Sequence, residues 1–303
     1  TIMRAEALFC QGHFTDAHIE LERAYEQVKD NGQINMALCC DLLSWRLSLH
    51  TDVAQRYTFE ERYEDLLRYH DASWINIWSA TSAYHHALRG ETDKIPRVFL
   101  QHRLSGINML APGKPMMEMI ENQVYLAQGA YARVAGRSAE LLAVCEAMHY
   151  ALVALHIRIQ TAAAYVQLGK LEEAHTWLEK ALSDAAPDGL VMPFAENYDH
   201  LKPLLAQEMK NDLIVKIAAL GEAARARNAI GARPAAFDAL TPREFEIVEL
   251  MAQRLSNREI AESLYLSEGS VKQYVNQIYS KLHIEGDTRT KRKQLAERFR
   301  QKT

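Results

Sequence analysis

The chain has 303 residues, 48% of them hydrophobic and 24% charged, and a formal net charge of −4 at pH 7. This composition is typical of a folded protein with two or more domains, and it excludes the disordered and collagen-like classes. No apolar run approaches the roughly 18 to 20 residues that a membrane-spanning helix needs, and the first residues lack the basic and apolar regions of a signal peptide. We therefore expect a cytoplasmic protein with no membrane partner.

Neither the cysteines nor the histidines indicate a metal site or an enzyme. The cysteines, at positions 10, 39, 40 and 145, form no CxxC pair and have no regular spacing, which favours buried, reduced thiols. The pair His85-His86 lacks the HExxH setting of a metalloprotease, and no activated nucleophile or pair of carboxylates can be nominated. The prediction is a chain without a catalytic site and without a metal.

A repeated pattern runs through residues 1–186, which are rich in Leu, Ala, Glu and Gln and predict one helix after another. Clear copies begin at Gly12 and Gly169, weaker copies at Gly90 and Gly129, and a degenerate copy near position 51, so the period is near 39 residues. A glycine suits the end of a first helix because it adopts a backbone conformation that other residues avoid. The repeat therefore predicts a series of helical hairpins.

This repeat resembles tetratricopeptide-like hairpins, which stack into a solenoid with a concave binding surface. The alternative is a generic helical bundle with coincidental spacing. Projecting the phase of the repeat places Trp45, Tyr84 and Gln123 on the concave face. We therefore nominate these three residues as contacts for an effector, either a small molecule or a protein.

After residue 186 the repeat lapses. Two helices, at about 195–209 and 211–228, are predicted to extend the solenoid over residues 187–227. Residues 228–237 contain Gly and Pro without periodicity and predict a linker. A separate domain, 238–303, is expected to follow.

The sequence of the last domain predicts three helices, arranged in the order of a helix-turn-helix. The residues Thr-Pro-Arg-Glu at 241–244 have the form of a capping box and begin a helix that runs to about position 255. A short second helix covers 258–264, and Ser267 caps a third helix that runs to about position 282. Ala261 matters because the third helix must cross the second at close range.

The two faces of the third helix differ in chemistry. At 100° per residue, one face carries Val271, Val275, Ile278 and Leu282, and the other carries Lys272, Gln273, Asn276 and Ser280. In a major groove, Lys suits the acceptors of guanine, while Gln and Asn suit adenine. The polar face is therefore the predicted DNA-reading surface.

The motifs of this domain resemble those of LuxR-type regulators. Leu-Thr-Pro-Arg-Glu stands at 240–244, Leu-Ser-Asn-Arg-Glu-Ile-Ala at 255–261, Leu-Ser-Glu-Gly-Ser-Val-Lys at 266–272 and Ile-Tyr-Ser-Lys-Leu at 278–282, in the order and at the spacing of that family. The resemblance implies four helices, of which the third reads DNA and the fourth, at 288–300, supports dimerisation. The sequence departs from the usual pattern at Gly269 and Tyr274, which leaves the recognised bases open.

The resemblance also implies a set of DNA contacts. It places Lys272, Gln273 and Asn276 at bases and Arg258 and Lys281 near phosphates, and Ser270 completes the predicted set. From Gly286 onward seven basic residues stand against two acidic ones. This basic cluster is predicted to add nonspecific affinity for phosphate, the alternative being an ordinary solvated charge run.

A helical repeat region followed by this domain resembles the large ATP-binding LuxR-family regulators, in which a nucleotide-binding domain precedes a solenoid that binds an inducer. The chain contains no GxxxxGK[ST] motif, so no cofactor is expected in it, and ATP is expected only for a domain ahead of residue 1. Because the chain begins at Thr1 and not at Met, we expect the C-terminal part of a longer regulator; a short natural form is the alternative.

The sequence thus predicts an all-α, sequence-specific DNA-binding transcription regulator, with a tetratricopeptide-like solenoid followed by a four-helix domain. Its expected partners are double-stranded DNA, a second copy of the chain on that DNA, an effector bound to the repeats, and RNA polymerase. The alternative from a different class is a helical-repeat interaction scaffold whose terminal module does not read DNA. A scaffold has no reason to keep Lys272, Gln273 and Asn276 together beside a basic tail, which favours the regulator.

Overall fold

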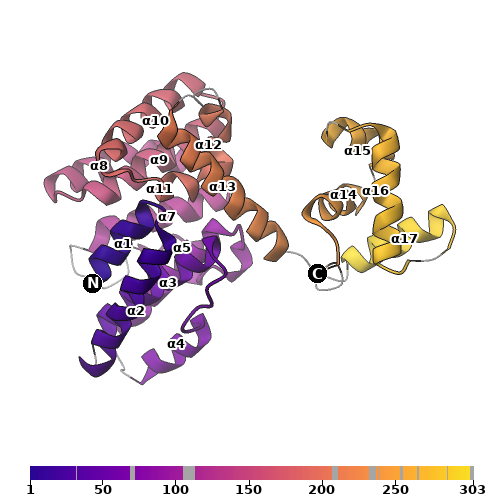
Figure 1. Ribbon diagram of the computed structural model, residues 1–303. Coiled ribbons are helices and arrows are strands. Elements are labelled where there is room, and N and C mark those ends of the chain that lie inside the picture. Colours follow the sequence, from indigo (N-terminus) through magenta and orange to yellow (C-terminus); the bar gives the residue numbers. More distant parts are fainter. Residues whose placement is uncertain are drawn as a thin grey trace. The chain divides into compact units, whose positions relative to one another are not determined.

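The computed structural model describes residues 1–31, 33–68, 72–104, 113–206, 211–231, 237, 239–252, 255–264, 266–284 and 286–300. Every regular element in these ranges is a helix, as the sequence predicts (Figure 1). The chain divides into two compact units, Thr1–Arg225 and Ala226–Thr303. Within the described ranges, no helix is both long and apolar enough to cross a bilayer.

Helices in pairs make up the N-terminal unit. Its elements are α1 (Ile2–Cys10), α2 (Phe14–Asn31), α3 (Ile34–His50), α4 (Phe59–Leu67), α5 (Ala72–Leu88), η1 (Thr92–Lys94), α6 (Arg97–Leu100), α7 (Lys114–Ala127), α8 (Tyr131–Ala147), α9 (Ala151–Gln167), α10 (Leu171–Ala185), η4 (Ala186–Asp188), α11 (Met192–Ala195), α12 (Tyr198–Leu205) and α13 (Asp212–Gly231). Consecutive helices α1 and α2, α7 and α8, and α9 and α10 pack against each other as hairpins (Figure 1).

The repeated glycines mark real helix ends. Gly12, Gly90, Gly129 and Gly169 follow α1, α5, α7 and α9, and each has a φ between 68° and 79°. A residue with a Cβ rarely adopts this left-handed backbone, so the glycine ends the helix and turns the chain into the next one. Two cycles depart from the pattern, because α4 begins eight residues after Thr51 and α6 is a single turn. The likeness to tetratricopeptide hairpins stays a prediction.

A segment after the last hairpin closes the interior of this unit. The Val191 amide donates to the Cys10 carbonyl of α1 at 2.8 Å. The Arg46 guanidinium of α3 donates to the Glu196 carboxylate at 2.8 and 3.1 Å, and the Tyr84 hydroxyl of α5 donates to the same carboxylate at 2.9 Å. Three helices far apart in the chain are therefore tied to residues 191–196.

The three nominated effector contacts lie in this interior. Trp45, Tyr84 and Gln123 are 0%, 3% and 3% exposed. The Trp45 indole donates to the Tyr57 carbonyl at 2.8 Å, and the Gln123 amide donates to Asn197 Oδ1 at 3.1 Å. They do not line an open surface in this structure, because residues 191–197 and neighbouring side chains cover them. Their nomination as effector contacts stays a prediction.

The C-terminal unit folds around its own apolar core. Its helices are α14 (Pro242–Ala252), α15 (Asn257–Leu264), α16 (Glu268–Lys281) and α17 (Thr288–Arg300). The core includes Ile247, Val271, Ile278 and Leu295, none of them more than 1% exposed. The first of these helices ends three residues before the expected position 255, and α17 has the bounds that the family resemblance implied.

The predicted linker, 228–237, is shorter than expected. Helix α13 continues to Gly231, so the first four residues of that range are helical. At the other end Phe237 is fully buried and packs against Phe245, with the ring centroids 5.8 Å apart. Residues 232–236 lie outside the described ranges. The end of α13 is not predicted from the sequence, because the nearby glycine and proline hide the periodicity of the Ala-rich residues before them.

A glycine at the contact between α12 and α13 gives a stability prediction. A Cβ on Gly221 would lie 2.3 Å from Cγ of Tyr198, far inside van der Waals contact. We expect Gly221→Ala to lower the free energy of unfolding by about 1 to 3 kcal/mol, the usual cost of overpacking. Gly136→Ala on α8 is the matched control, because no atom lies within 4 Å of its Cβ position. That variant should gain up to about 1 kcal/mol from helix propensity. Urea denaturation followed by circular dichroism measures both, and equal effects would contradict the proposed contact.

Buried histidines make the N-terminal unit sensitive to acid. Burial lowers the pKa of His156 to about 4 and of His85 to about 3, and the unfolded value is near 6.5. At a pH between the folded and unfolded pKa values, the unfolded chain binds more protons than the folded chain. The free energy of unfolding therefore decreases as the pH falls below 6.5, on the order of 1 to 2 kcal/mol per histidine by pH 5. The C-terminal unit contains a single histidine, His283, which is exposed.

Hydrogen exchange of the full chain at pH 7 and pH 5 checks this prediction. After correction for the intrinsic exchange rate, helices α3, α5 and α9 should lose protection at pH 5, while α14 to α16 should keep theirs. His156→Gln should reduce the loss, and His13→Gln, a change on an exposed side chain, should not. Equal loss of protection in both units would show that the histidines are not responsible.

Candidate nucleic-acid interface

Side-chain caps begin three helices of the C-terminal unit. The Thr241 hydroxyl accepts from the Glu244 amide at 3.3 Å, and the Glu244 carboxylate accepts from the Thr241 amide at 2.6 Å. Ser256 and Glu259 make the same reciprocal pair for α15. The Ser267 hydroxyl accepts from the Ser270 amide at 3.0 Å and caps α16. The structural roles predicted for Glu244 and Ser267 are confirmed, and these caps fix where each helix starts.

Helix α16 presents an apolar face to the core and a polar face to solvent. Val271, Val275 and Ile278 are buried, whereas Lys272, Gln273 and Asn276 are exposed. The inner face packs against α15 and α14, and Ala261 on α15 is only 6% exposed at this contact. The helix is therefore held from behind while its three candidate base-reading side chains remain accessible.

The Lys272 side chain makes a weak ion pair in the structure. Its ammonium lies 3.0 Å from the Glu268 carboxylate one turn earlier, and the two side chains are 62% and 50% exposed. A solvent-exposed pair of this kind contributes less than about 1 kcal/mol. The pair can therefore open at little cost when another acceptor, such as a base edge, approaches the ammonium.

Lys281 has a structural partner that the sequence did not reveal. Its ammonium donates to the Glu244 carboxylate at 2.8 Å, and that carboxylate is 3% exposed. Burial alone would raise the pKa of Glu244, but the hydrogen bonds from Lys281 and Thr241 lower it below its ordinary value. The carboxylate thus caps α14 and also ties α14 to the end of α16. The predicted phosphate contact of Lys281 stays a prediction.

The two remaining nominated residues lie at helix starts. Arg258 is exposed in the first turn of α15. The Ser270 hydroxyl is half-buried and lies 2.8 Å from the Ser267 hydroxyl, inside the cap of α16. Their proposed contacts with DNA stay predictions. For Ser270 the cap supplies a sufficient structural reason for the hydroxyl.

Three arginines bind backbone carbonyls, two of them at helix ends. Arg243 donates to the Leu264 carbonyl at 2.8 Å, Arg298 donates to the Leu282 carbonyl at 2.8 Å, and Arg292 donates to the Leu255 carbonyl. Leu264 and Leu282 lie at the C-terminal ends of α15 and α16, where carbonyls lack partners within the helix and a cation also suits the helix dipole, whereas Leu255 lies between α14 and α15. No local sequence pattern predicts these bonds, because each joins residues 16 to 37 positions apart.

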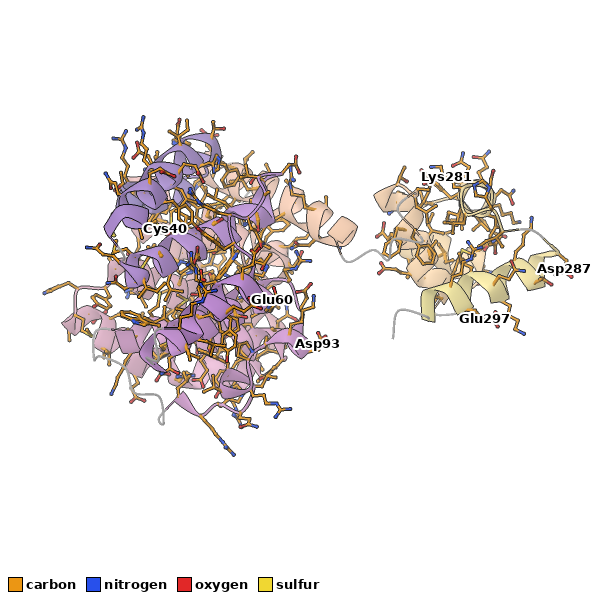
Figure 2. The ribbon with its side chains drawn as sticks, turned by 90° about the horizontal axis from the view of Figure 1, so that it is seen from below. Cys40, Glu60, Asp93, Lys281, Asp287 and Glu297 are labelled. Carbon is orange, nitrogen blue, oxygen red and sulfur yellow. The ribbon has the colours of Figure 1, made fainter. Side chains whose placement is uncertain are left out.

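Helix α17 uses part of its charge internally. The Asp287 carboxylate accepts from the Thr290 amide at 2.7 Å and caps the helix, while Glu297 lies 3.8 Å from the Lys293 ammonium; both acidic residues are labelled in Figure 2. The Lys291 ammonium lies 5.6 Å from the centre of the Tyr279 ring. With Arg292 and Arg298 bound to carbonyls, the basic tail presents fewer side chains for phosphate than its composition suggests.

Comparison with known proteins covers this unit. Residues 238–292 match the family model described as bacterial regulatory proteins, luxR family. The chain is 47% identical over 49 residues to the transcriptional regulatory protein LnrK of Bacillus subtilis, a match of 16% of the chain and 22% of the relative. It is 45% identical over 49 residues to the transcriptional regulatory protein DegU of Brevibacillus brevis, a match of 16% and 21% respectively.

A longer match extends beyond these 49 residues. The chain is 30% identical over 104 residues to the nitrate/nitrite response regulator protein NarP of Escherichia coli, a match of 34% of the chain and 47% of the relative. The matches thus span less than half the length of each of these relatives. No solved structure matches the chain significantly.

The caps, the split faces of α16 and the family match agree with one another and with the motifs at 240–282. The C-terminal domain of this chain is a helix-turn-helix domain of the luxR family of bacterial regulatory proteins.

Proposed function

We propose that the chain is a sequence-specific DNA-binding transcription regulator that inserts α16 into the major groove. The observation that carries the proposal is the face of α16 formed by Lys272, Gln273 and Asn276, which is exposed on a helix whose opposite face is buried. A helix of this kind fits the major groove, and these side chains have the donors and acceptors that base edges require. The relatives named as transcriptional regulatory proteins support the same function.

The partners follow from this proposal. Two copies of the chain bind one DNA site, with α17 as the contact between them, and the regulator acts on transcription through RNA polymerase in the cytoplasm. The N-terminal unit, with its own core and a separate set of helices, receives the signal as a sensor or partner-binding region. No catalytic step is part of this function.

Selection of DNA from a random library by the full chain tests the proposal. Enriched fragments should share a sequence with two-fold symmetric half-sites about 10 base pairs apart, as a dimer of reading helices requires. Retention of DNA without enrichment of any sequence would overturn sequence-specific reading and favour the scaffold with a non-reading terminal module.

Replacing Lys272 with Ala should weaken binding to the selected site by about 1 to 3 kcal/mol, the value of a good base contact, without unfolding the domain. The side chain is 62% exposed and contributes only a weak ion pair to the fold. Binding to the selected site and to a random duplex is measured at one salt concentration. Lys180→Ala, a change on an exposed lysine of α10, is the control for loss of charge. Equal losses on both duplexes would assign Lys272 to phosphate instead of a base.

Lys281→Met should destabilise the C-terminal domain by about 1 to 3 kcal/mol, because it leaves the buried Glu244 carboxylate without its cationic partner. Combining it with Glu244→Gln should restore part of this loss, since Gln still supports the capping box. Thermal unfolding measures the stability, and DNA binding well below the transition reports any phosphate contact. An unchanged unfolding free energy in Lys281→Met would show that the pair does not support the fold.

A further inference from the structure

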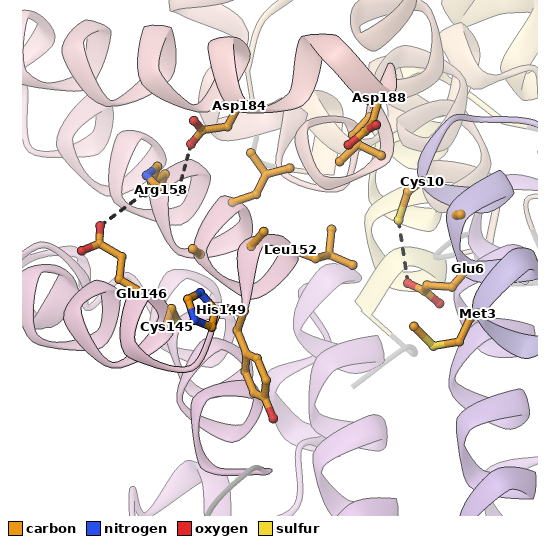
Figure 3. A pocket seen from close by; sticks show the side chains of 16 residues that line it. Met3, Glu6, Cys10, Cys145, Glu146, His149, Leu152, Arg158, Asp184 and Asp188 are labelled. Atoms are coloured by element: carbon orange, nitrogen blue, oxygen red, sulfur yellow. Dashed lines mark hydrogen bonds and ion pairs between the residues drawn. The ribbon is translucent and has the colours of Figure 1, made fainter.

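The N-terminal unit contains a cavity of about 700 Å³ where its first helix meets its last hairpins (Figure 3). Helix α1 forms one wall with Met3, Glu6 and Cys10, and the ends of α8 and α10 with the first half of α9 form the others. Pockets for small molecules usually have volumes of about 300 to 1,000 Å³. This cavity therefore has the size of a ligand site, and it is distinct from the filled interior around Trp45 and Tyr84.

Carboxylates outnumber cations around the cavity. Among the described residues that line it, Glu6, Glu146, Asp184 and Asp188 are acidic, and Arg158 is the guanidinium. Figure 3 shows Arg158 between Asp184 and Glu146, with nitrogen to oxygen distances of 2.9 and 3.9 Å. These two carboxylates already neutralise the guanidinium, so the site offers little attraction to an anion and an excess of negative charge to a cation.

Arg158 is held in place before any ligand arrives. Its residue is 8% exposed, and the short contact with Asp184 joins α9 to the end of α10. Asp188 is exposed at the start of the segment that returns toward α1. On the opposite wall Glu6 shares the Arg46 guanidinium with Glu196, so its charge is compensated only in part. Net negative charge therefore remains on both walls, and among the described lining carboxylates Asp188 is the one without an ion pair.

Apolar side chains cover the rest of the lining. Leu155 is buried, Leu190 is half-buried, Leu152 is 36% exposed and Met3 is 81% exposed. A ligand with an apolar body would remove the two exposed side chains from water while its charged group faced the carboxylates. Apolar lining with a few convergent polar groups is the usual composition of a small-molecule site.

We propose that this cavity binds a small organic cation with an apolar body, such as an alkylamine, with the ammonium at Asp188 and the apolar part against Leu152, Leu155 and Met3. The regulatory meaning of the site rests on the proposed sensor function of the N-terminal unit. A ligand there joins α1 to α9 and α10, and α1 also carries Glu6, which binds Arg46 at the centre of the unit. A ligand in the cavity is therefore linked, through α1 and Glu6, to Arg46, which binds the segment that closes the fold.

Three probes of equal length separate charge from apolar contact. Hexylamine, hexanol and hexanoate are titrated into the full chain at pH 7 by calorimetry. Hexylamine should bind more tightly than hexanol by about fivefold, the value of a partly exposed ion pair, and hexanoate should bind more weakly than hexanol. Equal affinity for the three probes, or no binding at all, would overturn the proposal.

Variants locate the binding. Asp188→Asn changes an exposed side chain, and Asp184→Asn frees Arg158 from its nearer carboxylate. Each should lower the affinity for hexylamine by about fivefold, and Asp184→Asn should raise the affinity for hexanoate. Glu173→Gln, on the exposed first turn of the same helix α10, is the matched control and should change nothing. If hexylamine binds both Asp variants as it binds the unaltered chain, the amine is held elsewhere and the proposal fails.

The test of amine binding and the test of DNA binding can fail independently. Lys272→Ala should lose specific DNA affinity and bind hexylamine normally, since the cavity lies wholly in the N-terminal unit. Loss of amine binding in Asp188→Asn with intact DNA binding supports the site. Failure of DNA selection with intact amine binding would refute the proposed function and leave the site standing.

Discussion

The N-terminal unit depends on a buried carboxylate supplied by the segment that follows its last hairpin. Glu196 has no exposed side-chain surface, and Arg46, itself 5% exposed, binds it with two hydrogen bonds. Burial by itself raises the pKa of Glu196, but the guanidinium outweighs burial and the pKa lies below its ordinary value. Removing one partner of such a pair costs about 3 to 5 kcal/mol, because the other charge stays buried. Residues 191–197 are therefore part of the core of this unit.

This closure changes where a ligand can bind. In a stack of helical hairpins the inner faces of the first helices normally form an open surface. Here Tyr84 and Gln123 on two such helices bind Glu196 and Asn197 instead. The polar side chains that would recognise a ligand thus already have partners within the chain. A cavity lies elsewhere, at the junction between α1 and the last hairpins, where carboxylates and exposed leucine and methionine side chains form part of the lining.

The sequence predicted the C-terminal domain well because its signals are local. Thr241 and Glu244, like Ser267 and the amide of Ser270, lie three positions apart, so a cap can be recognised from spacing alone. The two faces of α16 follow from helical periodicity in the same way. The burial of Tyr84 could not be predicted, because its partner Glu196 lies 112 positions away. Repeat phase indicates which way a side chain faces, but it does not show which later segment covers that face.

The arginines that bind backbone carbonyls affect how the domain would respond to salt on DNA. A cation that neutralises a phosphate releases a condensed counterion, so the slope of affinity against salt concentration counts phosphate contacts, not basic residues. Residues 238–303 contain 12 Lys and Arg. Arg243, Arg292 and Arg298 donate to backbone carbonyls of the domain itself. In a DNA complex these three release no counterions as long as they keep the carbonyls, so affinity falls less steeply with ionic strength than the composition implies. The proposed sequence-dependent contacts of α16 would then carry a larger share of the binding at physiological salt.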